Sequence, residues 1–198
     1  MSVDPNAQTQ DPPSPPPSGG SLGEAARYLV PVLVGAAVAV VLGVYGRFHE
    51  PAGTAFNLAG FSSTSAVKSW LATAALAFGV VQVVAALAMY GRLPGVPAAA
   101  WTPVLHRWSG RVAFLLAVPV AVHCLYGLGY QTYSARAAWH SLIGCFFFGA
   151  FSVKMLLLRM ERLPGWLLPV AGGGVFAALA VLWLTSALWF FRTFGVTT

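Results

Sequence analysis

The sequence predicts an all-α integral membrane protein, a five-transmembrane-helix bundle with a disordered N-terminal tail. Three observations predict it. Of the 198 residues, 58% are apolar and only 8% are charged, whereas soluble domains carry about 25% charged residues. The mean hydropathy is +0.73. Five apolar runs approach the length of about 20 residues that crosses a bilayer. A soluble fold could not bury so much apolar surface, so the soluble and disordered classes are excluded.

The first 25 residues differ from the rest of the chain. They hold six of the fourteen prolines and three of the five acidic residues, with almost no large apolar side chain. Such a segment cannot offset the entropy of ordering, so we expect residues 1–25 to be a disordered tail. It lacks the basic start and early apolar core of a cleaved signal peptide. Residues 26–198 form the predicted transmembrane domain.

The five apolar runs are interpreted as helices over about 28–46, 66–90, 105–129, 137–158 and 166–190. Pro31 lies in the first turn of the first helix, where a missing N–H is harmless. Lys68 lies at the start of the second helix, and its long side chain can extend toward the membrane interface. The runs lack period-2 alternation and are too long for barrel strands. The link 47–65 is expected to fold back on the membrane surface.

The distribution of basic residues predicts the orientation. Five spans put the two termini on opposite sides of the membrane. Seven basic residues lie on the side of the N-terminus: Arg27, Arg92, Arg107, Arg111, Lys154, Arg159 and Arg162. Four lie on the other side: Arg47, Lys68, Arg136 and Arg192. The bias predicts a multi-pass plasma-membrane protein with its N-terminus in the cytoplasm and its C-terminus outside. No basic run suggests a nucleic-acid partner, and the lipid bilayer is the expected surrounding.

Three of the four histidines lie on the predicted helices at a regular spacing. They are His106, His123 and His140, and each is followed four residues later by a glycine, Gly110, Gly127 and Gly144. His106 and His123 share one helix and lie ~25 Å apart along it, so they cannot hold the same ion. His123 lies near the end of the third span and His140 near the start of the fourth. The two therefore lie at nearly the same depth on adjacent antiparallel helices.

Two imidazoles that face each other at one depth suit the axial ligation of haem iron. Gly127 and Gly144, one turn from the ligands on the same face, would leave room for the porphyrin edge. Arg136, one turn before His140, could reach a haem propionate. Pro119 should kink the third span and widen the gap. The cofactor predicted is a non-covalent b-type haem, because the chain has no C-x-x-C-H motif.

Other interpretations of these residues remain open. Histidine in a membrane helix often makes an interhelical hydrogen bond, and a copper or zinc site is a further alternative, although structural zinc takes four ligands. Gly110 is interpreted as a packing contact. His106 has no histidine partner at its depth, but three methionines lie near that depth, Met89, Met155 and Met160. His106 is therefore either a ligand of a second haem or not a metal ligand.

The stretch LHRWSGRVAFLLAVPVAVHCLYGLGY, followed by AAWHSLIGCFFFGAFSVKM, resembles the haem-binding cores of ferric-reductase-like and cytochrome-b-type membrane proteins. That resemblance implies b-type haem and electron transfer, with His123 and His140 as ligands. The chain has one such pair and no flavin or nicotinamide domain, which implies a redox subunit of a larger complex. A second resemblance, over spans two to five and including RLPGWLLPVAGGG and LWLTSALWFF, is to a bacterial five-helix membrane family of unknown function.

The sequence thus supports three functional hypotheses. The first is an electron-transfer subunit with one bis-histidine haem near the outer leaflet, exchanging electrons with a quinone or membrane redox subunit and with an exported redox protein. The second is a non-redox scaffold or assembly subunit whose histidines make interhelical hydrogen bonds. The third is a small transporter, for which Gly172–Gly174 would interrupt the fifth span.

Overall fold

The computed structural model of the chain describes residues 21–53, 58 and 60–197. Its elements are α1 (Ser21–Phe48), α2 (Thr64–Met89), α3 (Thr102–Val122), the π-helix η1 (His123–Leu128), α4 (Ala135–Leu157), α5 (Leu167–Thr185) and α6 (Ala187–Phe194). Five stretches are long and apolar enough to cross a membrane, namely 26–48, 64–89, 102–128, 135–157 and 167–194. The five predicted spans are therefore confirmed as helices, with ends within a few residues of the expected ones except at the start of α1, which lies seven residues earlier than 28.

The predicted tail falls largely outside this description. Residues 1–20 of the expected segment 1–25 are not among the described residues. The remaining part, 21–25, is helical, because α1 begins at Ser21. The expectation of disorder was wrong there. Ala25 and Ala26 are strong helix formers, and they allow the first turns of α1 to extend beyond its apolar run.

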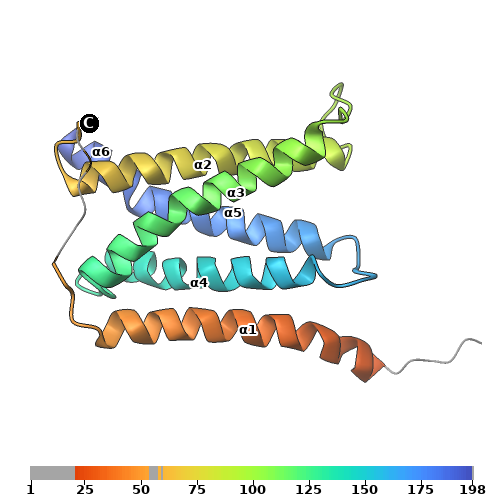
Figure 1. Cartoon of the computed structure of the whole chain (residues 1–198), viewed down its shortest axis with the longest axis horizontal. Coiled ribbons are helices and arrows are strands. Elements are labelled where there is room, and N and C mark those ends of the chain that lie inside the picture. Colours follow the sequence, from red (N-terminus) through yellow and green to blue (C-terminus); the bar gives the residue numbers. More distant parts are fainter. Residues whose placement is uncertain (1–20, 54–57, 59, 198) are drawn as a thin grey trace, which may run out of the picture.

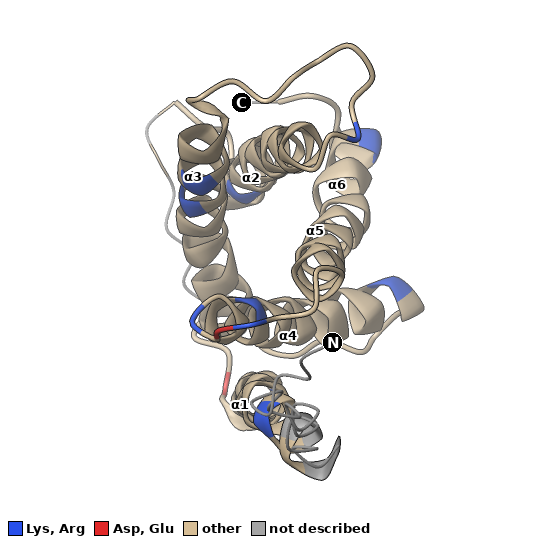
Figure 2. Ribbon diagram, turned by 90° about the vertical axis from the view of Figure 1, so that its right-hand side faces the viewer, with Lys and Arg blue, Asp and Glu red and all other residues tan. Residues whose placement is uncertain are grey.

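α2, α3, α4 and α5 surround a common centre, and α1 lies on the outside (Figures 1 and 2). α2 packs along α3, α4 packs along α5, and α2 also contacts α5 and α6. α1 lies outside this ring and packs mainly on α4 (Figure 2). Within the described part of the chain, the backbones of α3 and α4 lie further apart than those of the other neighbouring helices of the ring. Aromatic side chains join these two helices, because Phe114 of α3 stacks on Phe151 of α4 with ring centroids 4.0 Å apart.

The contact between α1 and α4 depends on two glycines. A Cβ atom added at Gly149 would lie 2.5 Å from the backbone oxygen of Gly35, and one added at Gly35 would lie 2.7 Å from the oxygen of Gly149. Both distances are too short for any side chain, so only glycine permits this close crossing of the two backbones. Small residues at such crossings are typical of membrane helices, where packing replaces the hydrophobic effect.

The π-helix η1 follows Pro119 at the end of α3. A prolyl residue cannot donate a backbone hydrogen bond, and irregular helix turns are common beyond it. The described part of the link after α1 runs beside η1: the N–H of Ala52 donates to the carbonyl of Tyr126 (3.2 Å) and that of Gly53 to the carbonyl of Gly127 (3.3 Å). Residues 54–57 and 59 of the expected fold-back segment lie outside the described residues.

An aromatic stack attaches the same link to the bundle. The imidazole of His49 lies between two tyrosine rings, with centroids 4.8 Å from Tyr45 and 5.0 Å from Tyr126. Tyr45 belongs to α1 and Tyr126 to η1. His49 therefore joins the end of the outer helix to the π-helix, and it has a packing role at this end of the molecule.

The fifth span is interrupted, but not where the glycines predicted. Gly172–Gly174 lie inside the continuous helix α5, because their backbone groups remain in the helical ladder. The break comes at Ser186, with φ −120° and ψ −74°. The hydroxyl of Ser186 donates to the carbonyl of Leu182 (2.7 Å). Arg136 donates to the carbonyl of Thr185 (2.6 Å). The Arg136 side chain thus satisfies the Thr185 carbonyl at the break, whereas the Leu182 carbonyl also accepts the backbone N–H of Ser186 (3.1 Å).

Substitution of Gly149 tests the crossing of α1 and α4. We expect Gly149→Leu to separate the two helices, lowering stability by about 1–3 kcal/mol through overpacking, measured as a reduced melting temperature in detergent. Gly174→Leu is the matched control, since a Cβ there meets no atom within 4 Å. Equal melting temperatures for the two variants would contradict the close crossing.

Candidate ligand cavity at one end of the bundle

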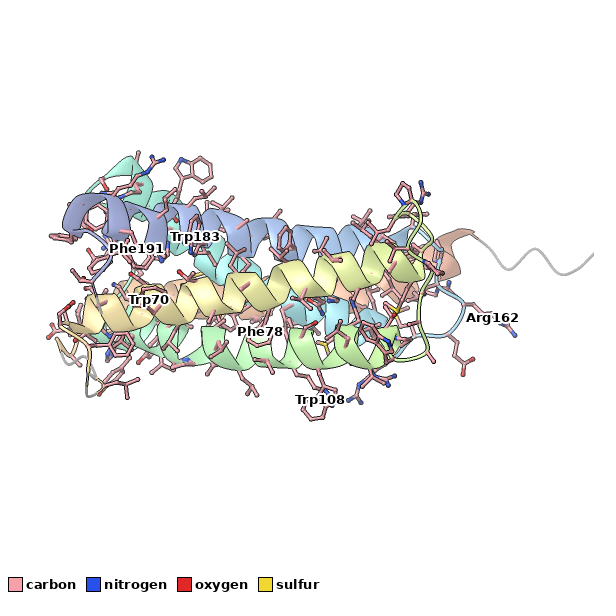
Figure 3. The ribbon with its side chains drawn as sticks, turned by 90° about the horizontal axis from the view of Figure 1, so that it is seen from above. Trp70, Phe78, Trp108, Arg162, Trp183 and Phe191 are labelled. Atoms are coloured by element: carbon pink, nitrogen blue, oxygen red, sulfur yellow. The ribbon has the colours of Figure 1, made fainter. Side chains whose placement is uncertain are left out.

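A cavity of about 350 Å³ lies at the end of the bundle where α1 ends and α2 begins, with walls from α2, α3, η1, α4, α5 and α6. Its volume falls in the range of small-molecule sites. Three aromatic residues from different helices, Trp70, Trp183 and Phe191, gather at the same end (Figure 3). The indole N–H of Trp183 donates to the hydroxyl of Thr73 (2.9 Å), which ties α5 to α2 beside the cavity.

The cavity is polar at its mouth and apolar at its floor. The floor includes Ala75, Phe147 and Leu179, which belong to the buried core of the bundle. Lys68 and Arg136 line the cavity within the first two turns of α2 and α4. No aspartate or glutamate of the described residues lines it. A ligand of this cavity would therefore place an apolar body inward and a polar or anionic group outward.

His140 lines the cavity with its ring fixed by a neighbouring helix. Its Nδ1 lies 2.9 Å from Oγ1 of Thr185 on α5. The Thr185 hydroxyl is itself 2.8 Å from the carbonyl of Val181, which can only accept. When the single hydroxyl proton goes to that carbonyl, Nδ1 of His140 is the donor to Thr185. Nε2 then carries the lone pair, and it makes no hydrogen bond to any described residue.

Arg136 is held by the same segment of α5 and α6. Besides its hydrogen bond to the carbonyl of Thr185, its guanidinium lies 3.9 Å from the ring centroid of Trp189. Stacking on an aromatic ring restrains the plane of a guanidinium. Thr185 therefore positions two residues of α4 that were predicted from the sequence. Its hydroxyl contacts His140, and its backbone carbonyl accepts the hydrogen bond from Arg136.

His123 and Gly127 do not line the cavity, although both belong to the predicted haem site. His123 is 6% exposed and is the first residue of η1. Its neighbour Cys124 lines the cavity, as do Leu125 and Leu128 of the same element, and neighbouring residues on a helix point about 100° apart. Gly127 is buried and accepts the hydrogen bond from Gly53 of the link. The structure thus does not bring these two residues to the cavity wall that carries His140.

His106 contacts α2 far from the cavity lining. Its Nδ1 lies 2.9 Å from the backbone oxygen of Gln82, to which it must donate. A Cβ added at Gly110 would lie 2.1 Å from Nε2 of Gln82. Gly110 is therefore a packing position between α2 and α3, as expected from the sequence.

Gly144 differs from Gly110 in its surroundings. It lines the cavity, and a Cβ added there would meet only Cδ2 of Leu182 at 3.8 Å. Cys124 and Cys145 are free thiols that also line the cavity. Among the residues that the structure describes, no group of three or more His, Cys, Asp or Glu side chains could hold a metal ion. The donor set of the cavity is thus centred on the single imidazole of His140.

Sequence reasoning missed two residues of this site. Lys68 was interpreted only as a helix-end lysine that reaches the interface, and Thr185 was not singled out. Thr185 could have been found, because it lies near the end of the fifth span and His140 near the start of the fourth. The depth argument that paired His123 with His140 applies equally to Thr185. Nothing in the sequence indicates that Lys68 faces inward.

The comparisons with known proteins identify the family. A family model described as a family of unknown function, DUF6529, matches residues 28–198. The chain belongs to this family. No curated protein and no solved structure matches it. The DUF6529 match covers all five spans and agrees with the predicted family of unknown function, whereas the predicted likeness to cytochrome-b-type proteins has no support from these comparisons.

The two glycines that follow His106 and His140 provide a matched pair for a test. We expect Gly110→Leu to push α2 and α3 apart and lower stability by about 1–3 kcal/mol, measured by thermal unfolding in detergent. Gly144→Leu should leave the melting temperature nearly unchanged, because its side chain enters the cavity. Similar losses of stability for both variants would mean that the space beside Gly144 is closed in solution.

Proposed function

We propose that this DUF6529 protein is a membrane electron-transfer subunit that holds one b-type haem in the cavity, with His140 as an axial ligand. One observation carries the proposal. Nδ1 of His140 lies 2.9 Å from the Thr185 hydroxyl, and in the tautomer in which Nδ1 donates to it the Nε2 lone pair is left for a ligand at the cavity wall. A hydrogen bond at the second ring nitrogen is the usual way in which proteins orient a metal-binding histidine.

The residues of α4 fit this cofactor well. His140 supplies an imidazole held by Thr185, Gly144 leaves open space one turn further along, and Arg136 supplies a cation near the mouth. The residues of η1 fit less well, since His123 is buried beside the cavity-lining Cys124. His123 remains the proposed second ligand, because it is the histidine expected at the depth of His140. The experiment below tests it separately.

When bound, the haem iron would supply one-electron redox chemistry. The chain's own residues would bind the group, orient it and exclude water from it. The floor of Ala75, Phe147 and Leu179 keeps the inner end of the cavity apolar. A quinone or membrane redox subunit and an exported redox protein are the proposed partners, and the lipid bilayer surrounds the bundle. The chain would work as a redox subunit of a larger complex.

We also propose that the cavity faces the outside of the plasma membrane. The start of α1 and the α2–α3 and α4–α5 links share the opposite end of the bundle (Figure 1). There Arg27 donates to the backbone oxygen of Arg162 (2.9 Å), and Arg162 extends away from the bundle (Figure 3). The end with seven of the eleven basic residues is the proposed cytoplasmic end.

A second candidate function is a non-redox scaffold. It is favoured by two hydrogen bonds between helices, from His106 to the carbonyl of Gln82 and from His140 to the hydroxyl of Thr185. Each joins two neighbouring membrane helices, and such bonds contribute on average about 0.6 kcal/mol in a membrane protein. In this alternative the histidines stabilise the bundle and no cofactor is bound.

The histidine variants distinguish these two functions. We expect the purified chain to show b-type bands in a reduced-minus-oxidised spectrum. His140→Ala and His123→Ala should each lower the haem content by about tenfold or more, because a b-type haem is held through its axial ligands. His106→Ala is the control and should keep the spectrum, since its imidazole is bound to α2 away from the cavity.

A colourless and stable wild-type protein would overturn the haem proposal in favour of the scaffold. If only His140→Ala loses haem, His123 is not a haem ligand, and the cavity is still the haem site. Loss of half the haem in His106→Ala would require a second haem at the other end of the bundle.

Single cysteines test the orientation. In a variant that lacks Cys124 and Cys145, Thr132→Cys in the α3–α4 link should react with a membrane-impermeant maleimide on intact cells, because positive charge retains the other end inside. Glu161→Cys in the α4–α5 link should react only after permeabilisation. The reverse labelling pattern would put the cavity on the cytoplasmic side.

A further inference from the structure

Lys68 is a cation without an ionic partner in the described part of the chain. It lies in the second turn of α2, is half-buried and lines the cavity. Among the described residues its ammonium makes neither a hydrogen bond nor an ion pair. A lysine at a membrane helix end can extend into water, and this one also lines the cavity. A cation without an ionic partner beside a cavity is a candidate ligand-binding group.

Arg136 lines the same cavity from α4, and most N–H groups of its guanidinium make no hydrogen bond to the described residues. A guanidinium has five N–H groups, and the structure gives one hydrogen bond, to the carbonyl of Thr185. Its stacking on Trp189 restrains the group, so little freedom remains to be lost when a second partner binds. Planar guanidinium groups match the geometry of carboxylates.

No acidic side chain of the described residues balances the charges around the cavity. Glu50 and Glu161 are the acidic residues whose side chains the structure describes, and neither lines the cavity. Glu161 belongs to the α4–α5 link at the other end of the bundle. Two cations therefore stand at the mouth of a cavity whose floor is apolar. A carboxylate attached to an apolar body complements both features.

We propose that Lys68 and Arg136 form a carboxylate-binding rim, and that the cavity takes a ligand with a carboxylate head and an apolar body. The rim shares its cavity with the proposed function but does not depend on haem. The same chemistry has two sources: the propionates of a haem, or the head of a fatty acid from the membrane. In either case the anionic head lies at Lys68 and Arg136, and the body extends toward Ala75 and Phe147.

The test compares each acid with its ester on the full chain in detergent. In the first arm, haemin and haemin dimethyl ester are titrated and followed by their absorption. In the second arm, dibromostearic acid and its methyl ester are titrated and followed by quenching of tryptophan fluorescence, since Trp183 and Trp189 line the cavity. We expect the acid to bind at least about tenfold more tightly than the ester, equivalent to ~1.4 kcal/mol, in at least one arm.

Variants assign that preference to the rim. Lys68→Met should remove most of the preference for the acid and leave ester binding unchanged, and Lys68→Arg should restore it. Arg192→Met is the matched control, because Arg192 is a cation of α6 at the same end but does not line the cavity. Its preference should equal that of the wild type. The comparison of acid with ester on the wild type holds even if a variant does not fold.

The outcomes separate this inference from the haem proposal. A preference for the acid that depends on Lys68 in the haemin arm supports the rim with propionates as its ligand. The same preference in the fatty-acid arm alone supports the rim and counts against haem. Equal binding of acid and ester in both arms, or a folded Lys68→Met protein that keeps the preference, would overturn the rim even if haem is present.

Discussion

Every backbone polar group that leaves the regular helical ladder within a membrane must find a partner in the protein. In the described chain, the backbone departs from a regular α-helix within the spans at η1 and at Ser186. Both lie at the cavity end of the bundle. The partners that satisfy them build that end. Backbone N–H groups of the link after α1 bind the carbonyls of η1, and Arg136 binds the carbonyl of Thr185. The residues that satisfy the irregular backbone therefore also determine the structure around the cavity.

The two ends of the bundle use the same short pattern for different purposes. His106 and Gly110 close the contact between α2 and α3, where the imidazole donates to a backbone oxygen and the glycine admits Gln82. His140 and Gly144 leave a space, because Thr185 holds the imidazole at the wall and nothing fills the position of the missing Cβ. A histidine followed by a glycine one turn later thus allows either close packing or a cavity. The neighbouring helix decides which.

Much of the fold and part of the site could be predicted from the sequence. The spans follow from apolar runs of bilayer length, and the shared face of Arg136, His140 and Gly144 follows from helical periodicity. The face of His123 could not be predicted, because η1 changes the register of the chain after Pro119. The start of α1 at Ser21 and the break at Ser186 were also missed. Both depend on local backbone choices that a hydropathy pattern does not record.

α1 is outside the ring, yet it reaches the cavity end through its link. The crossing of Gly35 and Gly149 fixes α1 on α4, and the stack of Tyr45, His49 and Tyr126 then fixes the end of α1 on η1. The N–H groups of the following residues bind the carbonyls of the π-helix. The outer helix therefore stabilises the irregular turn that contains His123. Because η1 also supplies cavity-lining residues such as Cys124 and Leu128, the shape of the cavity depends on a helix that does not line it.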